Sequence, residues 1–316
     1  MFDADLAVQQ LRYVYSQAYM RLLQVLDMPS VLGRQQRYLQ AQTVEVEKIL
    51  AELNEVSRRF ASRAIPKMYR QGIAMAVQPF AEAGMSTSLL PGFSGIHRTS
   101  VSVLSANFHD NMVDAHGFIG RRVRGQLRQL QLQTVMEKQA AGTVIDEAQL
   151  ELKKRFVDEG LTAFRDRAGK EWRLDSYANM AVRTVAREAT NQGLVNQLRG
   201  MGKNLVQITS HFGACEICAP LEGRVYSIDG SDSRFPPLSE AFGAYMTVHP
   251  NCKHSTQPYI EELDENPQGT QEHSNRPFDD DPRTAAEKAH YERTQREAAE
   301  RLEQRKAEEQ RKVEEG

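Results

Sequence analysis

Residues 211–260 contain all three cysteines of this 316-residue chain and three of its eight histidines. Cys215 and Cys218 form a Cys-x2-Cys pair, and His249 and Cys252 form a His-x2-Cys pair further along. These residue types and this local spacing are typical of tetrahedral zinc sites, where four nitrogen or sulfur ligands converge. The sequence therefore predicts a structural zinc site with the ligands Cys215, Cys218, His249 and Cys252, and with His254 and His211 as alternatives for the fourth position.

Other interpretations of the same cysteines remain open. They could pack without a metal, or two of them could form a disulfide, although three cysteines cannot all pair within one chain. No apolar run approaches the ~20 residues of a membrane span, and the N-terminus lacks the basic-then-apolar order of a signal peptide. We therefore expect synthesis in a cytosol and no membrane partner. Clustered Cys and His in a cytosolic protein favour a metal over a disulfide.

A catalytic metal is a further alternative for this cluster. Metal-activated water requires an open coordination position and a nearby base, whereas this segment offers more than enough ligands to close the shell. Asp229 and Asp232 lie in a Gly/Ser-rich stretch and have the character of turn residues. The sequence therefore favours a structural site over a catalytic one.

The composition favours helices. Apolar residues make up 40% of the chain, but only 7% of the residues are aromatic and 26% are charged, which suits helices with narrow buried stripes. Apolar periodicity predicts long N-terminal helices at about 3–27, 32–75 and 97–139, with Pro66 as a break or kink. Further helices are expected at 145–160, with Thr143 as its cap, and from Tyr177 to about residue 200, with Ser176 as its cap. Short strands are expected at 205–210 and 225–228.

The C-terminal part differs in character. Residues 261–316 carry a net charge of −7, so the rest of the chain carries +5 of the total of −2. Residues 261–282 are rich in Asp, Glu, Pro and Asn, which fits a linker, and 283–313 favour a polar helix that is solvated or frayed. We predict three regions: a helical region at 1–140, an α+β region with the Cys/His cluster at 141–262, and an acidic linker with a polar helical or disordered tail at 263–316.

One stripe of polar residues lies on the predicted helix that begins near Tyr177. Arg183, Arg187 and Asn191 recur every four residues and therefore share a face, with Thr184 beside them. They suit either an interface with a partner or a buried polar network. The sequence leaves this choice open.

Several motifs in combination resemble the type-2 class of phage minor capsid proteins. They are Gly169-Lys-Glu-Trp172, Arg183-Thr184, Cys215-Glu-Ile-Cys218-Ala-Pro220, Gly223-Arg-Val-Tyr226 and His249-Pro-Asn-Cys252-Lys-His254. We expect the likeness to cover about residues 1–262, with no counterpart for the tail from about residue 263.

The resemblance implies a virion component without enzymatic activity that is assembled into the phage head in the host cytoplasm, near the portal. Its implied partners are the portal protein and the major capsid or scaffold protein, with phage DNA as a further candidate. The alternative from another class is a metal-dependent nuclease or injected effector, since some relatives in the wider group carry such domains at the C-terminus. The C-terminal extension here is too polar and too short for one.

Overall fold

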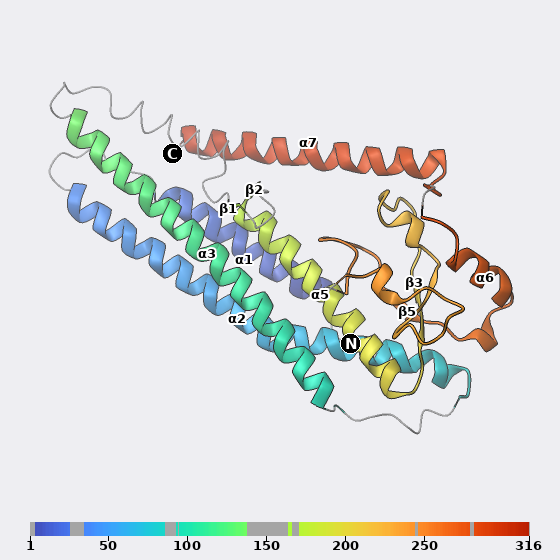
Figure 1. Ribbon diagram of the computed structural model, residues 1–316. Coiled ribbons are helices and arrows are strands. Elements are labelled where there is room, and N and C mark those ends of the chain that lie inside the picture. Colours follow the sequence, from blue (N-terminus) through green and yellow to red (C-terminus); the bar gives the residue numbers. More distant parts are fainter. Residues whose placement is uncertain are drawn as a thin grey trace. The chain divides into compact units, whose positions relative to one another are not determined.

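The computed structural model describes residues 4–25, 35–85, 93, 95–137, 164–165, 171–243, 246–278 and 281–315. Three long helices come first: α1 (Ala4–Gln24), α2 (Gln35–Glu82) and α3 (Gly95–Glu137). The remaining elements, coloured from green to red in Figure 1, are β1 (Phe164–Arg165), β2 (Glu171–Trp172), α5 (Leu174–Gly200), β3 (Leu205–Ile208), η1 (Ala219–Leu221), β4 (Val225–Ser227), η2 (Leu238–Glu240), β5 (Thr256–Pro258), η3 (Glu261–Leu263), α6 (Pro267–Ser274) and α7 (Ala285–Glu315). The predicted class, mainly α with a smaller α+β region, is confirmed.

The long helices lie close to their predicted ranges, with two differences. Helix α2 continues through Pro66 and Pro79, so Pro66 does not end it. Helix α5 begins before Ser176, because the Tyr177 amide already donates a helical hydrogen bond to the Arg173 carbonyl at 2.8 Å. Ser176 was predicted to cap this helix, but it lies inside the first turn and is not the cap. The predicted helix at 145–160 and its cap Thr143 lie outside the described residues.

The chain divides into two compact units. Unit 1 comprises Met1–Asp5, Ala61–Phe108 and Met180–Arg296, and unit 2 comprises Leu6–Phe60, His109–Asn179 and Glu297–Gly316. The three-region division at residues 140 and 262 stays a prediction.

Unit 2 is built on the apolar stripes of α1, the first part of α2 and the second part of α3. Leu11, Tyr15, Ala18 and Leu22 recur along one face of α1 and are buried. The Tyr15 hydroxyl lies 2.9 Å from His116 Nε2, and His116 Nδ1 lies 2.6 Å from Asn54 Oδ1. The polar groups in the middle of this apolar core therefore satisfy one another.

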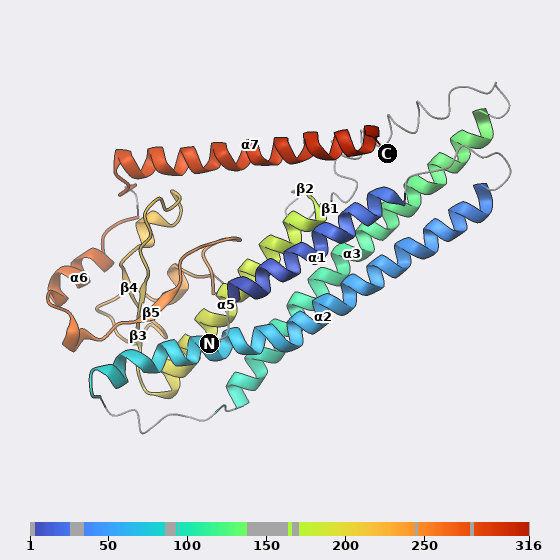
Figure 2. The same cartoon turned by 180° about the vertical axis from the view of Figure 1, so that it is seen from behind.

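Unit 1 packs α5 and the end of α2 against a small antiparallel sheet. β3 pairs with β4 on one side and with β5 on the other, with Val206 opposite Tyr226 on β4 and Ile208 opposite Thr256 on β5. The three strands are labelled in Figure 2. The buried core unites residues of α2, α5 and the sheet: Ala76, Phe80, Leu194, Val195, Leu198, Val206, Ile208, Tyr226 and Ile228. The two predicted strands are present, each slightly shorter than expected.

The predicted linker at 261–282 contains structure. Pro267–Ser274 form α6, and Asn266 caps this helix because its side-chain oxygen accepts a hydrogen bond from the Gly269 amide at 3.1 Å. An Asn at the N-cap followed by Pro at the first helical position favours such a start. The segment predicted to be a linker therefore contains a short helix.

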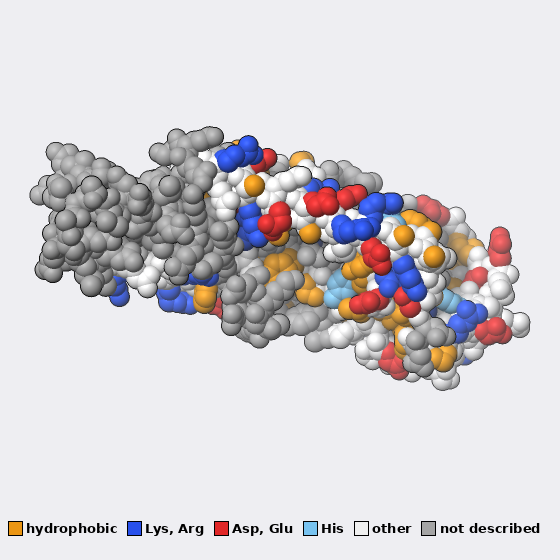
Figure 3. Space-filling view, turned by 90° about the horizontal axis from the view of Figure 1, so that it is seen from above, with side chains coloured by type: hydrophobic (Ala, Val, Ile, Leu, Met, Phe, Trp, Pro, Cys, Tyr) orange, Lys and Arg blue, Asp and Glu red, His pale blue; other side chains and the backbone are white. Residues whose placement is uncertain are grey.

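The coloured part of the surface in Figure 3 shows basic and acidic side chains interspersed. Within the described residues, no helix combines the length and apolar character that crossing a membrane requires.

Candidate metal centre

The sheet brings two distant loops together. One loop follows β3 and carries Cys215 and Cys218, and the other precedes β5 and carries His249 and Cys252. Because β3 and β5 are antiparallel neighbours, the end of β3 lies beside the start of β5. The pairing continues past the strands, since the Thr209 amide donates to the Ser255 carbonyl at 2.9 Å. Both loops therefore leave the sheet at the same end of its strands.

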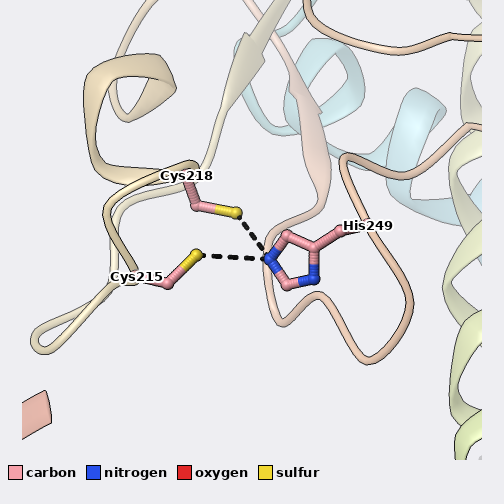
Figure 4. Close-up of side chains that lie close together, drawn as sticks. All are labelled: Cys215, Cys218 and His249. Carbon is pink, nitrogen blue, oxygen red and sulfur yellow. Dashed lines mark hydrogen bonds between the residues drawn. The ribbon is translucent and has the colours of Figure 1, made fainter. Parts of the chain in front are cut away.

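Three of the four predicted ligands, Cys215, Cys218 and His249, converge in one group, whereas Cys252 lies in a second group with Cys218 and His254. His249 Nε2 lies 3.3 Å from Cys215 Sγ and 3.1 Å from Cys218 Sγ (Figure 4), and Cys218 Sγ lies 3.7 Å from Cys252 Sγ. Bond lengths of about 2.3 Å to sulfur and about 2.0 Å to nitrogen place tetrahedral ligands about 3.8 Å apart for sulfur pairs and about 3.5 Å apart for sulfur and nitrogen. These three separations lie close to the expected values, and Cys252 is close to Cys218 without belonging to the group of Cys215 and His249.

His249 presents its Nε2 atom through a local contact. Its Nδ1 lies 2.8 Å from the Pro250 carbonyl oxygen, which can only accept, so Nδ1 carries the proton. Nε2 then offers its lone pair toward the two sulfurs. A ligating histidine commonly donates its other ring nitrogen to an acceptor in this way.

Thr184 supports the turn between His249 and Cys252. Asn251 has a φ of 63°, a left-handed conformation that Asn tolerates better than most residues. Its amide donates to Thr184 Oγ1 at 3.2 Å, and the Cys252 amide donates to the His249 carbonyl at 3.1 Å. Of the polar stripe on α5, Thr184 therefore contacts the candidate site, whereas Arg183 is exposed to solvent.

Asn191, on the same stripe, is part of a buried polar network. Its side chain donates to the Met246 carbonyl at 2.7 Å and accepts from the Thr256 amide at 3.0 Å. It thereby fixes α5 to the start of β5. Arg187 is half-buried on the same helix.

His254 contacts the cluster from the other side. Its Nδ1 lies 3.7 Å from Cys252 Sγ, its Nε2 lies 2.7 Å from Glu222 Oε1, and the residue is only 3% exposed. Burial opposes protonation of this ring, but hydrogen bonds to Cys252 and Glu222 outweigh it and raise the pKa of His254. Glu222 gave no signal in the sequence, because only the fold brings it to the histidine.

The cysteines differ in their tendency to ionise. Hydrogen bonds from Cys218 and, more weakly, from His254 lower the pKa of Cys252. The same hydrogen bond to Cys252, together with burial, raises the pKa of Cys218. These opposite shifts favour ionisation of Cys252 over Cys218, and the thiolate is the form that metals bind.

The donor set suits zinc. Cys215, Cys218 and His249 form one group of mutually close ligand atoms, and Cys218, Cys252 and His254 form a second group that shares Cys218. Among the described residues, neither group includes a carboxylate. His211 belongs to neither group; its ring packs on His254 with centroids 4.8 Å apart. Thiolate and imidazole ligands that close the coordination shell are typical of structural zinc.

Fold and site together define a mainly helical protein whose small sheet carries a partly buried Cys/His cluster at one end of its strands. The model of the family described as phage minor capsid protein 2 matches residues 34–315, and the chain belongs to this family. A protein described as a structural protein of Lactococcus phage LL-H is 31% identical over 114 residues. That segment covers 34% of this chain and 31% of the relative's length. No solved structure matches the chain.

The family resemblance predicted from the motifs is confirmed, but its extent differs from the predicted residues 1–262 at both ends, since the match begins at residue 34. The match continues to residue 315 and therefore includes the tail from residue 263. The polarity of the tail had suggested a separate extension. Its helices α6 and α7 contact the preceding residues through buried polar groups, which composition alone does not reveal.

Proposed function

We propose that this chain is a minor head protein, which assembles near the portal in the host cytoplasm and contacts the portal, the major capsid protein or the scaffold. The family match over residues 34–315 carries the proposal, and the name of the Lactococcus phage relative agrees with a structural role in a phage particle. The protein acts through its surfaces and carries out no catalysis.

The candidate metal centre acts as a staple in this proposal. Zinc is held by Cys215, Cys218, Cys252 and His249. His254 contacts Cys252 and is itself held in place by Glu222. The two loops at this end of the strands contain little regular structure, so a metal that links them stabilises the fold of unit 1 directly.

Particle composition tests the assembly role. Mass spectrometry of purified phage heads is expected to detect this chain, and an amber codon in its gene is expected to remove it and lower the yield of filled heads. The tagged full chain is captured from infected cells, and the captured material is probed separately with antibodies against the portal, scaffold and capsid proteins to identify the partner. Absence of the chain from purified heads would contradict the proposal.

Metal analysis of the purified full chain tests the staple. We expect about one zinc per chain and a lower melting temperature after EDTA treatment. Cys218→Ser is expected to melt at the lower temperature, with no further effect of EDTA. The proposed stabilising role of the metal would be contradicted if the wild-type protein contained no metal and if neither added zinc nor EDTA changed its melting temperature.

A nicking assay separates this proposal from the metal-dependent nuclease or effector. Supercoiled plasmid incubated with the chain and Mg²⁺, Mn²⁺ or Zn²⁺ is expected to stay intact. Cleavage that disappears in His249→Ala would overturn the structural assignment of the cluster.

A further inference from the structure

The first turns of α7 contact the loop that carries Cys215 and Cys218. Thr284 and Glu287 start the helix with reciprocal hydrogen bonds: the Thr284 amide donates to Glu287 Oε2 at 2.8 Å, and the Glu287 amide donates to Thr284 Oγ1 at 3.3 Å. This capping box fixes where α7 begins. Just before it, Arg283 Nη1 donates to the Ala214 carbonyl at 3.3 Å, directly beside Cys215.

Arg283 is held rigidly in this position. Its guanidinium forms two hydrogen bonds with Asp281, at 2.9 and 2.8 Å, and lies over the ring of Tyr291 at 5.6 Å from the centroid. Its side chain is only 9% exposed. A buried and oriented guanidinium makes a charge-assisted hydrogen bond that is stronger than that of a solvated one. The Ala214 carbonyl therefore has a specific partner in the α7 segment.

A second contact requires a glycine. The ring of His290 on α7 lies 5.0 Å from that of Phe212. Gly213 has a φ of +79°, and a Cβ atom there would approach His290 Cδ2 to 2.4 Å. Any larger residue would thus be strained in its backbone and would push the histidine away. The loop and the helix fit together only while the loop keeps this shape.

Few backbone hydrogen bonds hold that shape. Within 211–218 the Cys218 amide donates to the Cys215 carbonyl at 3.1 Å, and the same carbonyl accepts from the Ala219 amide at 2.9 Å. A metal bound by Cys215 and Cys218 would fix both ends of this turn. Three thiolates and one neutral imidazole around Zn²⁺ also carry a net negative charge, which favours the nearby Arg283 cation.

We propose that a metal bound at this centre fixes the loop at 211–218 on which α7 docks. Metal occupancy then controls whether residues 283–294 stay bound to that loop. The proposal rests on the metal centre proposed above. Metal-loaded protein holds the start of α7 in place, and metal-free protein releases it, which makes the charged helix available to a partner.

Hydrogen exchange of the full chain, detected by mass spectrometry, tests this control. Amides at 289–296 are expected to exchange about tenfold faster after zinc is removed with EDTA, and to recover when Zn²⁺ is added back. Gly213→Ala is expected to bind zinc as the wild type does, but to show the faster exchange even when loaded. Gly202→Ala is the matched control, because Gly202 has a φ of +69° and open space around it; its α7 amides should exchange like those of the wild type.

The outcomes separate this proposal from the metal centre itself. A chain that takes up no zinc overturns both. Zinc binding with no change at 289–296 on removal of zinc overturns only its control of α7. Unchanged exchange at 289–296 in zinc-loaded Gly213→Ala shows that α7 does not dock on the loop at 211–218.

Discussion

At the residue scale, the two histidines next to the cysteines are held by different partners. His249 contacts two sulfurs and is fixed by a carbonyl of its own turn, whereas His254 contacts one sulfur and is fixed by Glu222. Each histidine belongs to a group with two sulfurs, but His249 Nε2 lies 3.3 and 3.1 Å from its sulfurs, whereas His254 Nδ1 lies 3.7 Å from Cys252 Sγ. This difference favours His249 as the fourth ligand and His254 as its support.

Metal affinity tests this assignment. His249→Ala removes a ligand and is expected to weaken zinc binding by more than about 100-fold, whereas His254→Gln removes a supporting contact and is expected to weaken it by about 10–100-fold. Competition with a chromogenic chelator measures both affinities in the full chain. The reverse order of the two variants would identify His254 as the ligand.

Buried His116 makes unit 2 sensitive to acid. Burial, aided by repulsion from His109, lowers the pKa of His116 to about 3, so the folded chain keeps the ring neutral where the unfolded chain, with a pKa of about 6.5, is protonated. Stability from this group is complete above pH 6.5 and falls as the pH drops toward the folded value. Burial raises the pKa of Glu188 to about 7, and this carboxyl works in the opposite direction between pH 7 and 4.5.

A variant isolates the histidine from Glu188. Between pH 7.5 and pH 5 the wild type is expected to lose about 2 kcal/mol more unfolding free energy than His116→Asn, because only the wild type binds this proton on unfolding. Urea denaturation at both pH values measures the difference. Equal losses in the two proteins would show that His116 is not held neutral.

Some residues of the candidate site can be predicted from the sequence, and others cannot. Cys215, Cys218, His249 and Cys252 stand in pairs whose local spacing is itself the signal. Glu222 acts through a contact that spans 32 positions, so no local pattern marks it. Thr184 belongs with the predicted polar stripe, but its contact with Asn251 spans 67 positions and is not predictable from the stripe. The Arg283 contact with Ala214 spans 69 positions and is hidden for the same reason.

At the element scale, α2 and α5 approach each other through glycines. A Cβ atom at Gly193 would lie 2.1 Å from the Tyr69 carbonyl oxygen, and one at Gly72 would lie 1.9 Å from the Thr190 carbonyl oxygen. The backbones of the two helices are therefore in direct contact within unit 1. Isolated glycines inside helical patterns are the sequence signal for such a crossing, but they do not tell which helices meet.

Substitution tests the crossing. Gly193→Ala is expected to destabilise the protein by about 3 kcal/mol or more, because the methyl group meets a backbone atom that cannot move aside. Gly125→Ala is the control, since Gly125 is an exposed helical glycine of α3 with open space around it. It is expected to stabilise by about 0.5–1 kcal/mol. Urea denaturation compares both, and similar effects of the two would contradict the close contact.

At the scale of the whole molecule, the tail is part of the fold. Apolar periodicity predicted the long helices because each buries a stripe, whereas α6 and α7 bury few apolar groups and are positioned by polar contacts instead. Arg224 donates to the Ser274 and Pro277 carbonyls at the end of α6, at 3.3 and 3.2 Å. Composition therefore predicted the helical character of α7 but not that these segments belong to the family's folded part.

The second half of α7 provides the corresponding test in unit 2. Glu309 makes a bidentate pair with Arg173, at 3.0 and 2.8 Å, and both side chains are nearly buried, with 13% and 10% exposed. Removing Glu309 leaves the nearly buried Arg173 with the longer contact to Asp175 at 3.4 Å, so Glu309→Ala is expected to cost about 2 kcal/mol. Glu297→Ala, on the same helix, breaks a solvated pair with Arg301 at 3.9 Å and is expected to change little. Thermal unfolding of both full-length variants measures the contrast; equal melting temperatures would mean that α7 is a solvated tail after all.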